Sequence, residues 1–162
     1  MKEENIHILN RFSDYGIWVK SLHYAETDVW CAPISKGKWS VSAIIAHITN
    51  WDRYLLQKII PSLKKGDEMT FPDFDSFNHK ASMYADSGIS QQELIQEAVS
   101  SREALVDTLM HMPEGELTKT VPSNGVTHCP NTGEPYSLIY IIQEFIEHDH
   151  HHKQQIIEFL SK

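Results

Sequence analysis

The sequence has few cysteines, and the two it has lie far apart. Cys31 and Cys129 lack the close spacing of a zinc ribbon, and two thiols cannot build the disulfide framework of a small secreted domain. We expect two unpaired thiols with a structural role or none. The fold must then depend on a hydrophobic core. A chain of 162 residues with 41% apolar residues is large enough for one in a single domain, residues 1–162.

Long apolar runs and basic runs are also missing. No stretch approaches the roughly 20 apolar residues that cross a bilayer, and residues Met1–Glu4 are too acidic and polar for a secretory signal. These absences predict a soluble, cytoplasmic protein with no membrane partner. Acidic residues outnumber basic ones by 22 to 14, which gives a net charge of −8. Because such a chain repels phosphate backbones, we expect no nucleic-acid partner.

Strand signals are sparse, and amphipathic helical patterns account for most of the chain. Ser40 is a good N-cap, Ser90-Gln91-Gln92-Glu93 is a capping box, and Pro61 and Pro113 are expected to stop the helices that precede them. A shorter helix is expected over Ser76–Ala85. The four long helices are predicted at Glu3–Glu26, Ser40–Pro61, Ser90–Met112 and Ser137–Leu160.

Two long connections separate the later helices. One starts with a segment rich in Asp, Phe and Pro, Lys64–Asp75, and the other is a loop of about 24 residues, Pro113–Tyr136, of a length that is often functional. Four helices with such connections predict an all-α fold, a four-helix bundle with long crossover connections. Sites in these bundles are commonly built between facing helices.

Four histidines crowd into the five positions 148–152 of the last helix. On a helical wheel, His152 lies inside the apolar stripe and His148 at its edge, whereas His150 and His151 lie outside it. Two inward histidines one turn apart can coordinate one metal ion. The alternatives are an exposed histidine-rich turn that binds metal adventitiously, and buried, hydrogen-bonded histidines without metal. The segment does not resemble a terminal purification tag, because Asp149 interrupts the run of histidines and ordinary residues follow it.

A third ligand is expected from another helix, and His47 is the best candidate. It lies at the margin of the apolar stripe of the second helix, one turn before Trp51, which suits a residue that lines a cleft. The alternative is a solvated or hydrogen-bonded histidine at a helix edge. The other five histidines have no such context and are expected at the surface: His7, His23, His79, His111 and His128.

Two motifs resemble those of the DinB/YfiT-like metal-binding proteins, which include bacillithiol transferase-like members. Gly37-Lys38-Trp39-Ser40-Val41, followed by Ile45-Ala46-His47-Ile48 and Trp51, is similar to their second-helix signature. The run from His148 to Ile156 is similar to their closing motif, usually H-E-x-H-H-R-G-Q. The resemblance covers essentially the whole chain. The sequence departs from the usual motif at Lys153 and Gln154, where Arg and Gly are common.

The resemblance implies a four-helix bundle that holds one divalent ion, typically nickel or zinc, through His47, His148 and His152. Open coordination positions would take water or substrate. Asp149, on the flank of the apolar stripe, is a candidate for orienting a ligand imidazole, with a surface acid as the alternative. Imidazoles bind several metals, so the sequence does not choose between them.

The leading functional prediction is a metal-dependent thiol S-transferase that joins a low-molecular-weight thiol to an electrophilic small molecule. A non-catalytic metal-binding protein, induced by stress or DNA damage, is the alternative, and a metal-dependent hydrolase comes third. The absence of an evident general base favours thiol transfer, because a thiolate on a metal needs little further activation. The sequence leaves open whether the protein forms a homodimer.

Overall fold

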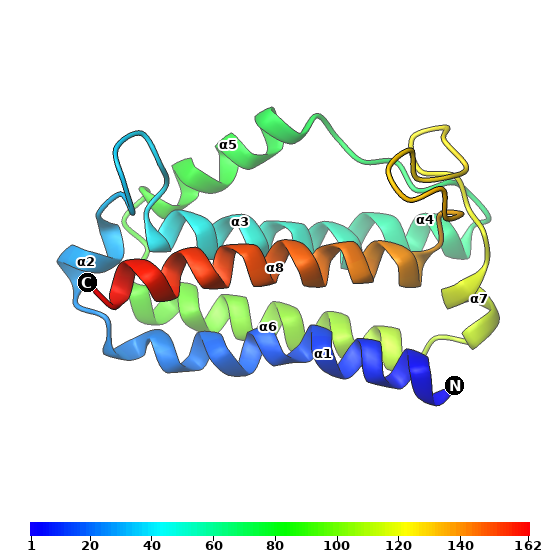
Figure 1. The fold of residues 1–162 in the computed structure, drawn as a ribbon, viewed down its shortest axis with the longest axis horizontal. Coiled ribbons are helices and arrows are strands. Elements are labelled where there is room, and N and C mark those ends of the chain that lie inside the picture. Colours follow the sequence, from blue (N-terminus) through cyan, green and yellow to red (C-terminus); the bar gives the residue numbers. More distant parts are fainter.

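Four long helices form a bundle (Figure 1), and the computed structural model describes all 162 residues. Shorter helical elements lie between and beside them, and the few β-bridges are isolated. The predicted fold class, an all-α four-helix bundle, is therefore confirmed. The long helices are α1 (Glu3–Lys20), α3 (Val41–Tyr54), α6 (Gln91–Met110) and α8 (Leu138–Leu160). The shorter elements are η1 (Ser21–Tyr24), α2 (Thr27–Cys31), η2 (Leu55–Ile59), α4 (Ile60–Lys64), α5 (Phe74–Ala85) and α7 (Glu114–Thr118).

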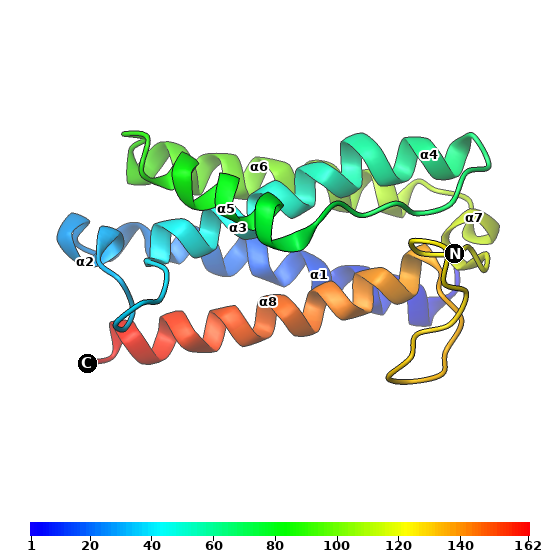
Figure 2. The ribbon, with the colours of Figure 1, turned by 90° about the horizontal axis from the view of Figure 1, so that it is seen from above.

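Helices α1 and α8 run in one direction along the bundle, and α3 and α6 run in the other (Figures 1 and 2). The first long connection, residues 65–90, returns along the length of the bundle and carries α5 beside α3. The second, residues 111–137, stays at the end where α6 finishes and includes the short helix α7, which the sequence pattern did not predict. Both long connections therefore contain helical structure of their own.

The predicted end of the second helix was wrong, because Pro61 does not stop the helix. The helix continues through the π-helical turn η2 into α4, and Pro61 lies in the first turn of α4. The π turn directly before it pairs the N–H of Ile60 with the carbonyl oxygen of Leu55, so the hydrogen-bond ladder is already re-spaced where Pro61 lacks an N–H. Gly66 follows the last turn with a left-handed φ of +84°, the usual device for ending a helix.

The first predicted helix was too long. Its α-helical part ends at Lys20, and the chain tightens into the 3-10 turn η1 before α2. The side-chain amide of Gln91, from α6, donates hydrogen bonds to the carbonyl oxygens of Leu22 and Ala25 at 3.2 and 2.8 Å. A tertiary contact thus satisfies carbonyls that a longer helix would have paired internally.

The helix starts were predicted correctly. Ser40, Ser90 and Ser137 each accept a hydrogen bond from a backbone N–H in the first turn, and Ser90 with Glu93 forms the complete capping box. The expected short helix is α5, and it begins two residues earlier than predicted, with Asp73 as its N-cap. Local side-chain to backbone bonds therefore fix these starts.

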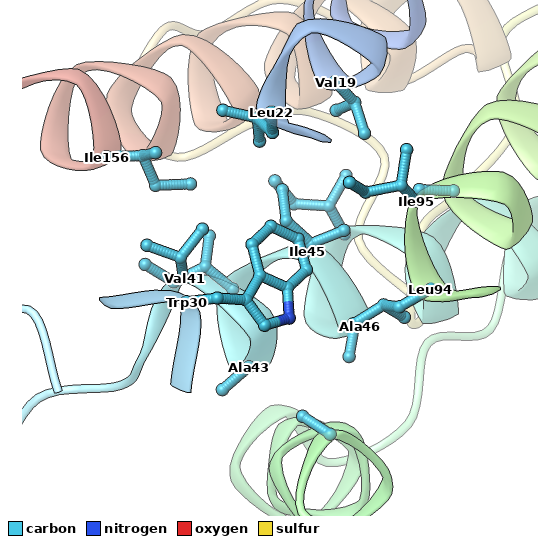
Figure 3. Close-up of a cluster of buried hydrophobic side chains, with 14 of the residues drawn as sticks. Val19, Leu22, Trp30, Val41, Ala43, Ile45, Ala46, Leu94, Ile95 and Ile156 are labelled. Atoms are coloured by element: carbon cyan, nitrogen blue, oxygen red, sulfur yellow. The ribbon is translucent and has the colours of Figure 1, made fainter. Parts of the chain in front are cut away.

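Apolar side chains from seven helical elements fill one half of the bundle core, part of which is drawn in Figure 3. Trp30 of α2 closes this half of the core, and Ile156 reaches it from α8. A second cluster fills the other half, around Leu9, Leu105 and Ile142. None of the helices is long and apolar enough to span a membrane.

Candidate metal centre

Three imidazoles meet between α3 and α8. His47 is buried on α3, and His148 and His152 are half-buried one turn apart on α8. Nε2 of His47 lies 3.0 Å from Nε2 of His148, and one ring nitrogen from each of the three lies within 4.8 Å of the other two. The structure thus brings together the three histidines that the sequence predicts as metal ligands.

The arrangement fits a divalent ion. Nitrogens that bind one zinc ion tetrahedrally at about 2.1 Å lie about 3.4 Å apart. That value falls between the 3.0 Å that separates Nε2 of His47 from Nε2 of His148 and the 4.8 Å within which all three nitrogens lie. The Nδ1 atoms of His47 and His148 are buried without a hydrogen-bond partner, so the histidines do not form a self-satisfied network. Ring nitrogens that face one another without an acid between them are the donor set that zinc and nickel take.

The surroundings of His47 and His152 favour the neutral form that a metal ligand needs. Burial, reinforced by the neighbouring imidazoles, lowers the pKa of His47 to about 3. Burial and the adjacent His148 lower the pKa of His152 to about 4. Both rings are therefore neutral at pH 7 and carry a free lone pair, which metal binding requires.

Local sequence explains how the rings are held. The indole of Trp39 packs on His47, with 5.0 Å between ring centroids, and the turn before it uses Gly37 at a φ of +74°. On α8, Nδ1 of His152 lies 2.9 Å from Oε1 of Gln155, an acceptor only. His152 must then donate from Nδ1, which leaves Nε2 free for a metal. Gln155 is the final residue of the closing motif, and this contact gives it a role.

The remaining histidines lie apart from this cluster. His150 and His151 are exposed, as the wheel predicts, and so are the five histidines expected at the surface. Cys31 is exposed, Cys129 is buried, and they form no disulfide. None of these side chains adds a ligand to the three imidazoles.

Asp149 is buried, so the alternative of a surface acid was wrong. Its Oδ2 accepts a hydrogen bond of 2.8 Å from Nη2 of Arg102, while its Oδ1 lies 3.7 Å from Nδ1 of His148. That second distance is too long for a hydrogen bond, and both atoms are buried without a partner. Asp149 thus lies beside a candidate ligand while an arginine holds its other oxygen.

Arg102 of α6 is almost fully buried and links its helix to the other three long helices. It donates to both carboxylate oxygens of Asp52 on α3, at 2.8 and 2.9 Å, and to Asp149 on α8. Its Nη1 donates to the carbonyl oxygen of Phe12 on α1 at 2.7 Å, and its guanidinium lies 3.8 Å from the Phe12 ring centroid. All three nitrogens of the guanidinium therefore have an acceptor, as a buried charge requires.

Sequence reasoning missed Arg102 and Asp52, although a signal exists. Asp52 lies seven residues after Ile45 and three before Leu55, which places it on the apolar face of its helix. Arg102 lies three residues before Leu105 and four after Ala98 on α6. A charged residue inside each of two apolar stripes indicates a buried ion pair between the two helices.

A cavity of about 390 Å³ adjoins the histidines between α3 and α8. Segments from both long connections contribute to its wall. Trp51 lies at the centre of its aromatic side, with ring centroids 5.5 Å from Phe74 and 6.0 Å from Phe145, and its Nε1 donates to Oδ1 of Asn78 at 3.0 Å. The lining residues are His47, Trp51, Phe71, Phe74, Asn78, Ser123, Tyr136, Ile141, Glu144, Phe145 and His148.

The cavity wall contains no lysine or arginine. It includes none of the basic residues Lys36, Lys38, Arg53 and Lys80. Arg53 instead pairs with Glu97 at 3.2 Å. The space in front of the histidines is therefore mainly apolar and aromatic.

Fold and site together define a helical bundle with a three-histidine centre beside an apolar cavity. The chain belongs to the DinB superfamily, which it matches over residues 18–156. It is also similar in structure to YfiT from Bacillus subtilis, described as a probable metal-dependent hydrolase with an unusual four-helix bundle topology. That match has a TM-score of 0.73 at 15% sequence identity and covers 98% of this chain and 87% of YfiT, so it shows a shared fold. No curated protein matches the chain.

Proposed function

We propose that this protein is a metal-dependent hydrolase that acts on a small molecule with an apolar or aromatic part. One observation carries the proposal: three clustered imidazoles, of which His47 and His148 line the wall, adjoin a cavity of about 390 Å³. A concave, mostly apolar pocket with a few polar groups is the usual form of a small-molecule site. The fold shared with YfiT, which is described as a probable metal-dependent hydrolase, supports the same class.

His47, His148 and His152 would hold one divalent ion, zinc or nickel. An ion held by three neutral imidazoles supplies a Lewis acid that lowers the pKa of a water or thiol ligand toward neutrality. Gln155 holds the His152 ring in the orientation that presents Nε2, and the tilted indole of Trp39 packs against the His47 ring. These neighbours keep the rings in place with little rearrangement, which strengthens a metal site.

The aromatic wall would exclude water from one side of the substrate. Trp51 is buried, and Phe71 and Phe145 are half-buried beside it. An apolar group of the substrate placed against these rings would displace weakly held water and leave the polar, reacting group toward His47 and His148. The shape of the cavity thus helps to orient the substrate.

Thiol transfer, the leading prediction from the sequence, remains a prediction. A thiol that carries carboxylates, such as glutathione, needs basic groups to bind it, and the cavity wall has no lysine or arginine. Hydrolysis needs no such thiol. The charge of the cavity wall therefore favours hydrolysis as the proposed reaction.

The test joins metal analysis to a turnover screen. Untagged protein should bind one zinc or nickel ion per chain, and the double variant His148→Ala, His152→Ala should lose that ion. The matched control, His150→Ala with His151→Ala, changes two exposed histidines on the same helix and should retain it. The loaded protein should hydrolyse neutral aryl esters or anilides, and a chelator should abolish the rate.

Three outcomes of the screen separate the candidate functions. A metal-dependent rate with an ester or anilide supports the hydrolase. A rate that requires an added thiol and consumes an alkylating agent would favour the transferase, and bacillithiol, glutathione and coenzyme A would each be tried. Full metal occupancy without turnover in either screen would favour a non-catalytic metal-binding protein.

A further inference from the structure

Glu144 is the one acidic residue in the wall of the aromatic cavity. It is exposed on α8, four residues before His148. Its carboxylate receives one weak hydrogen bond, from Sγ of Cys129 at 3.8 Å. No lysine or arginine pairs with it. A negative charge thus faces an aromatic cavity with no countercharge from the protein.

The rest of the wall favours a positively charged guest. Five aromatic rings line the cavity, and the negative faces of such rings attract ammonium groups. A carboxylate at the same site adds a direct charge interaction. The net charge of −8 raises the local concentration of cations and lowers that of anions around the whole molecule. The five rings are Trp51, Phe71, Phe74, Tyr136 and Phe145.

We propose that this cavity binds an organic cation, an amine or quaternary ammonium group of the substrate, between the aromatic rings and Glu144. One helical turn separates Glu144 from His148, an axial rise of about 6 Å. A cation held by Glu144 would therefore leave a bond a few atoms away within reach of the histidine cluster. The substrate class rests on the proposed hydrolase function, but cation binding itself can be measured without turnover.

The experiment compares choline with 3,3-dimethylbutan-1-ol, which has the same shape and no charge. Binding would be measured by calorimetry, with the indole N–H resonance of Trp51 followed by NMR, in zinc-loaded and in chelated protein. We expect choline to bind at least about tenfold more tightly than the alcohol and to shift the Trp51 resonance, because desolvated cation–aromatic contacts are worth that much.

Two charge-neutralising variants on one helix test the assignment. Glu144→Gln should weaken choline binding about threefold to fivefold, as expected for an exposed charge, and leave binding of the alcohol unchanged. Glu147→Gln makes the same charge change one turn away, at a residue that faces Arg11 at 3.5 Å and lies outside the cavity wall, and should leave choline binding unchanged. Both side chains are exposed, so neither change should disturb the fold.

Equal affinity for choline and the alcohol would overturn the proposal. So would an equal loss in the two glutamine variants, since that result would reflect the overall charge and not this cavity. Failure here is distinct from failure of the proposed function. Metal-dependent hydrolysis of neutral esters without choline binding would support the hydrolase and refute the cation site. Choline binding without any turnover would support the cation site and refute the hydrolase.

Discussion

Replacing Arg102 with methionine should be among the most destabilising single changes in this protein. The variant loses three charged hydrogen bonds to Asp52 and Asp149 and one bond to the Phe12 carbonyl, while methionine keeps some packing on the aromatic rings. Removing one partner of a buried ion pair typically costs about 3 to 5 kcal/mol. Against a total stability of about 5 to 15 kcal/mol, this is a large fraction.

Equilibrium unfolding in urea measures the effect. With a denaturant slope of about 2 kcal/mol per molar, the unfolding midpoint of Arg102→Met should fall by about 2 M. The matched control is Arg11→Met, which removes an exposed arginine that lies 3.5 Å from Glu147. Exposed pairs are worth at most about 1 kcal/mol, so the control should stay close to the wild type.

The loss should also depend on pH, and its sign follows from Asp52. Burial raises the pKa of Asp52 to about 6, although Arg102 opposes this shift. Without Arg102 the pKa rises further above its unfolded value, so the folded variant binds a proton more tightly than the unfolded chain. Its stability is then greatest at low pH and is lost as the pH rises through the folded pKa. The deficit should be larger at pH 8 than at pH 5, and a deficit below about 1 kcal/mol at pH 8 would refute the reasoning.

Three further predictions are independent of Arg102. The pKa values of about 3 for His47 and about 4 for His152 mean that, in chelated protein, neither ring should titrate by NMR between pH 8 and 5, and a midpoint near 6.5 would contradict this. Both values lie below the unfolded one, so metal-free stability should fall as the pH drops below about 6.5. Ser90→Ala should cost about 1 kcal/mol in urea unfolding through its capping bonds, whereas Ser100→Ala within the same helix should be near neutral. Random duplex DNA should not bind below micromolar concentrations at about 0.15 M salt, as fluorescence anisotropy would show, because a net charge of −8 offers few phosphate contacts.

Features that depend on local sequence were predictable. A serine N-cap bonds to residues two or three positions away, so the starts of α3, α6 and α8 follow from the sequence alone. The inward pair His148 and His152 follows from helical periodicity, since positions four apart share a face. The prediction of His47 as the third ligand required that the edges of the apolar stripes on two different helices face each other. The structure brings the three rings together.

Features that depend on contacts between distant segments were not predictable in the same way. The helix that passes Pro61 needs a π turn, and the early end of α1 needs the Gln91 amide from another helix. The cavity wall combines α3 and α8 with segments from both long connections, whose sequences carry no periodic signal. Its lack of basic residues could be seen only after the chain was folded.

The ion pairs of Arg102 explain how the histidine cluster keeps its geometry. His47 and Asp52 share α3, and His148 and Asp149 are neighbours on α8. Arg102 bonds both acids from the opposite side, so it fixes how far α8 is displaced along α3. A slip of one turn would move the helices by about 5.4 Å and separate Nε2 of His47 from Nε2 of His148, which are now 3.0 Å apart. Apolar packing tolerates sliding between ridges better than a forked arginine does, because each hydrogen bond requires its own acceptor at a fixed distance. The charged core residues therefore fix the axial register of α8 against α3, and this register keeps the candidate ligands together.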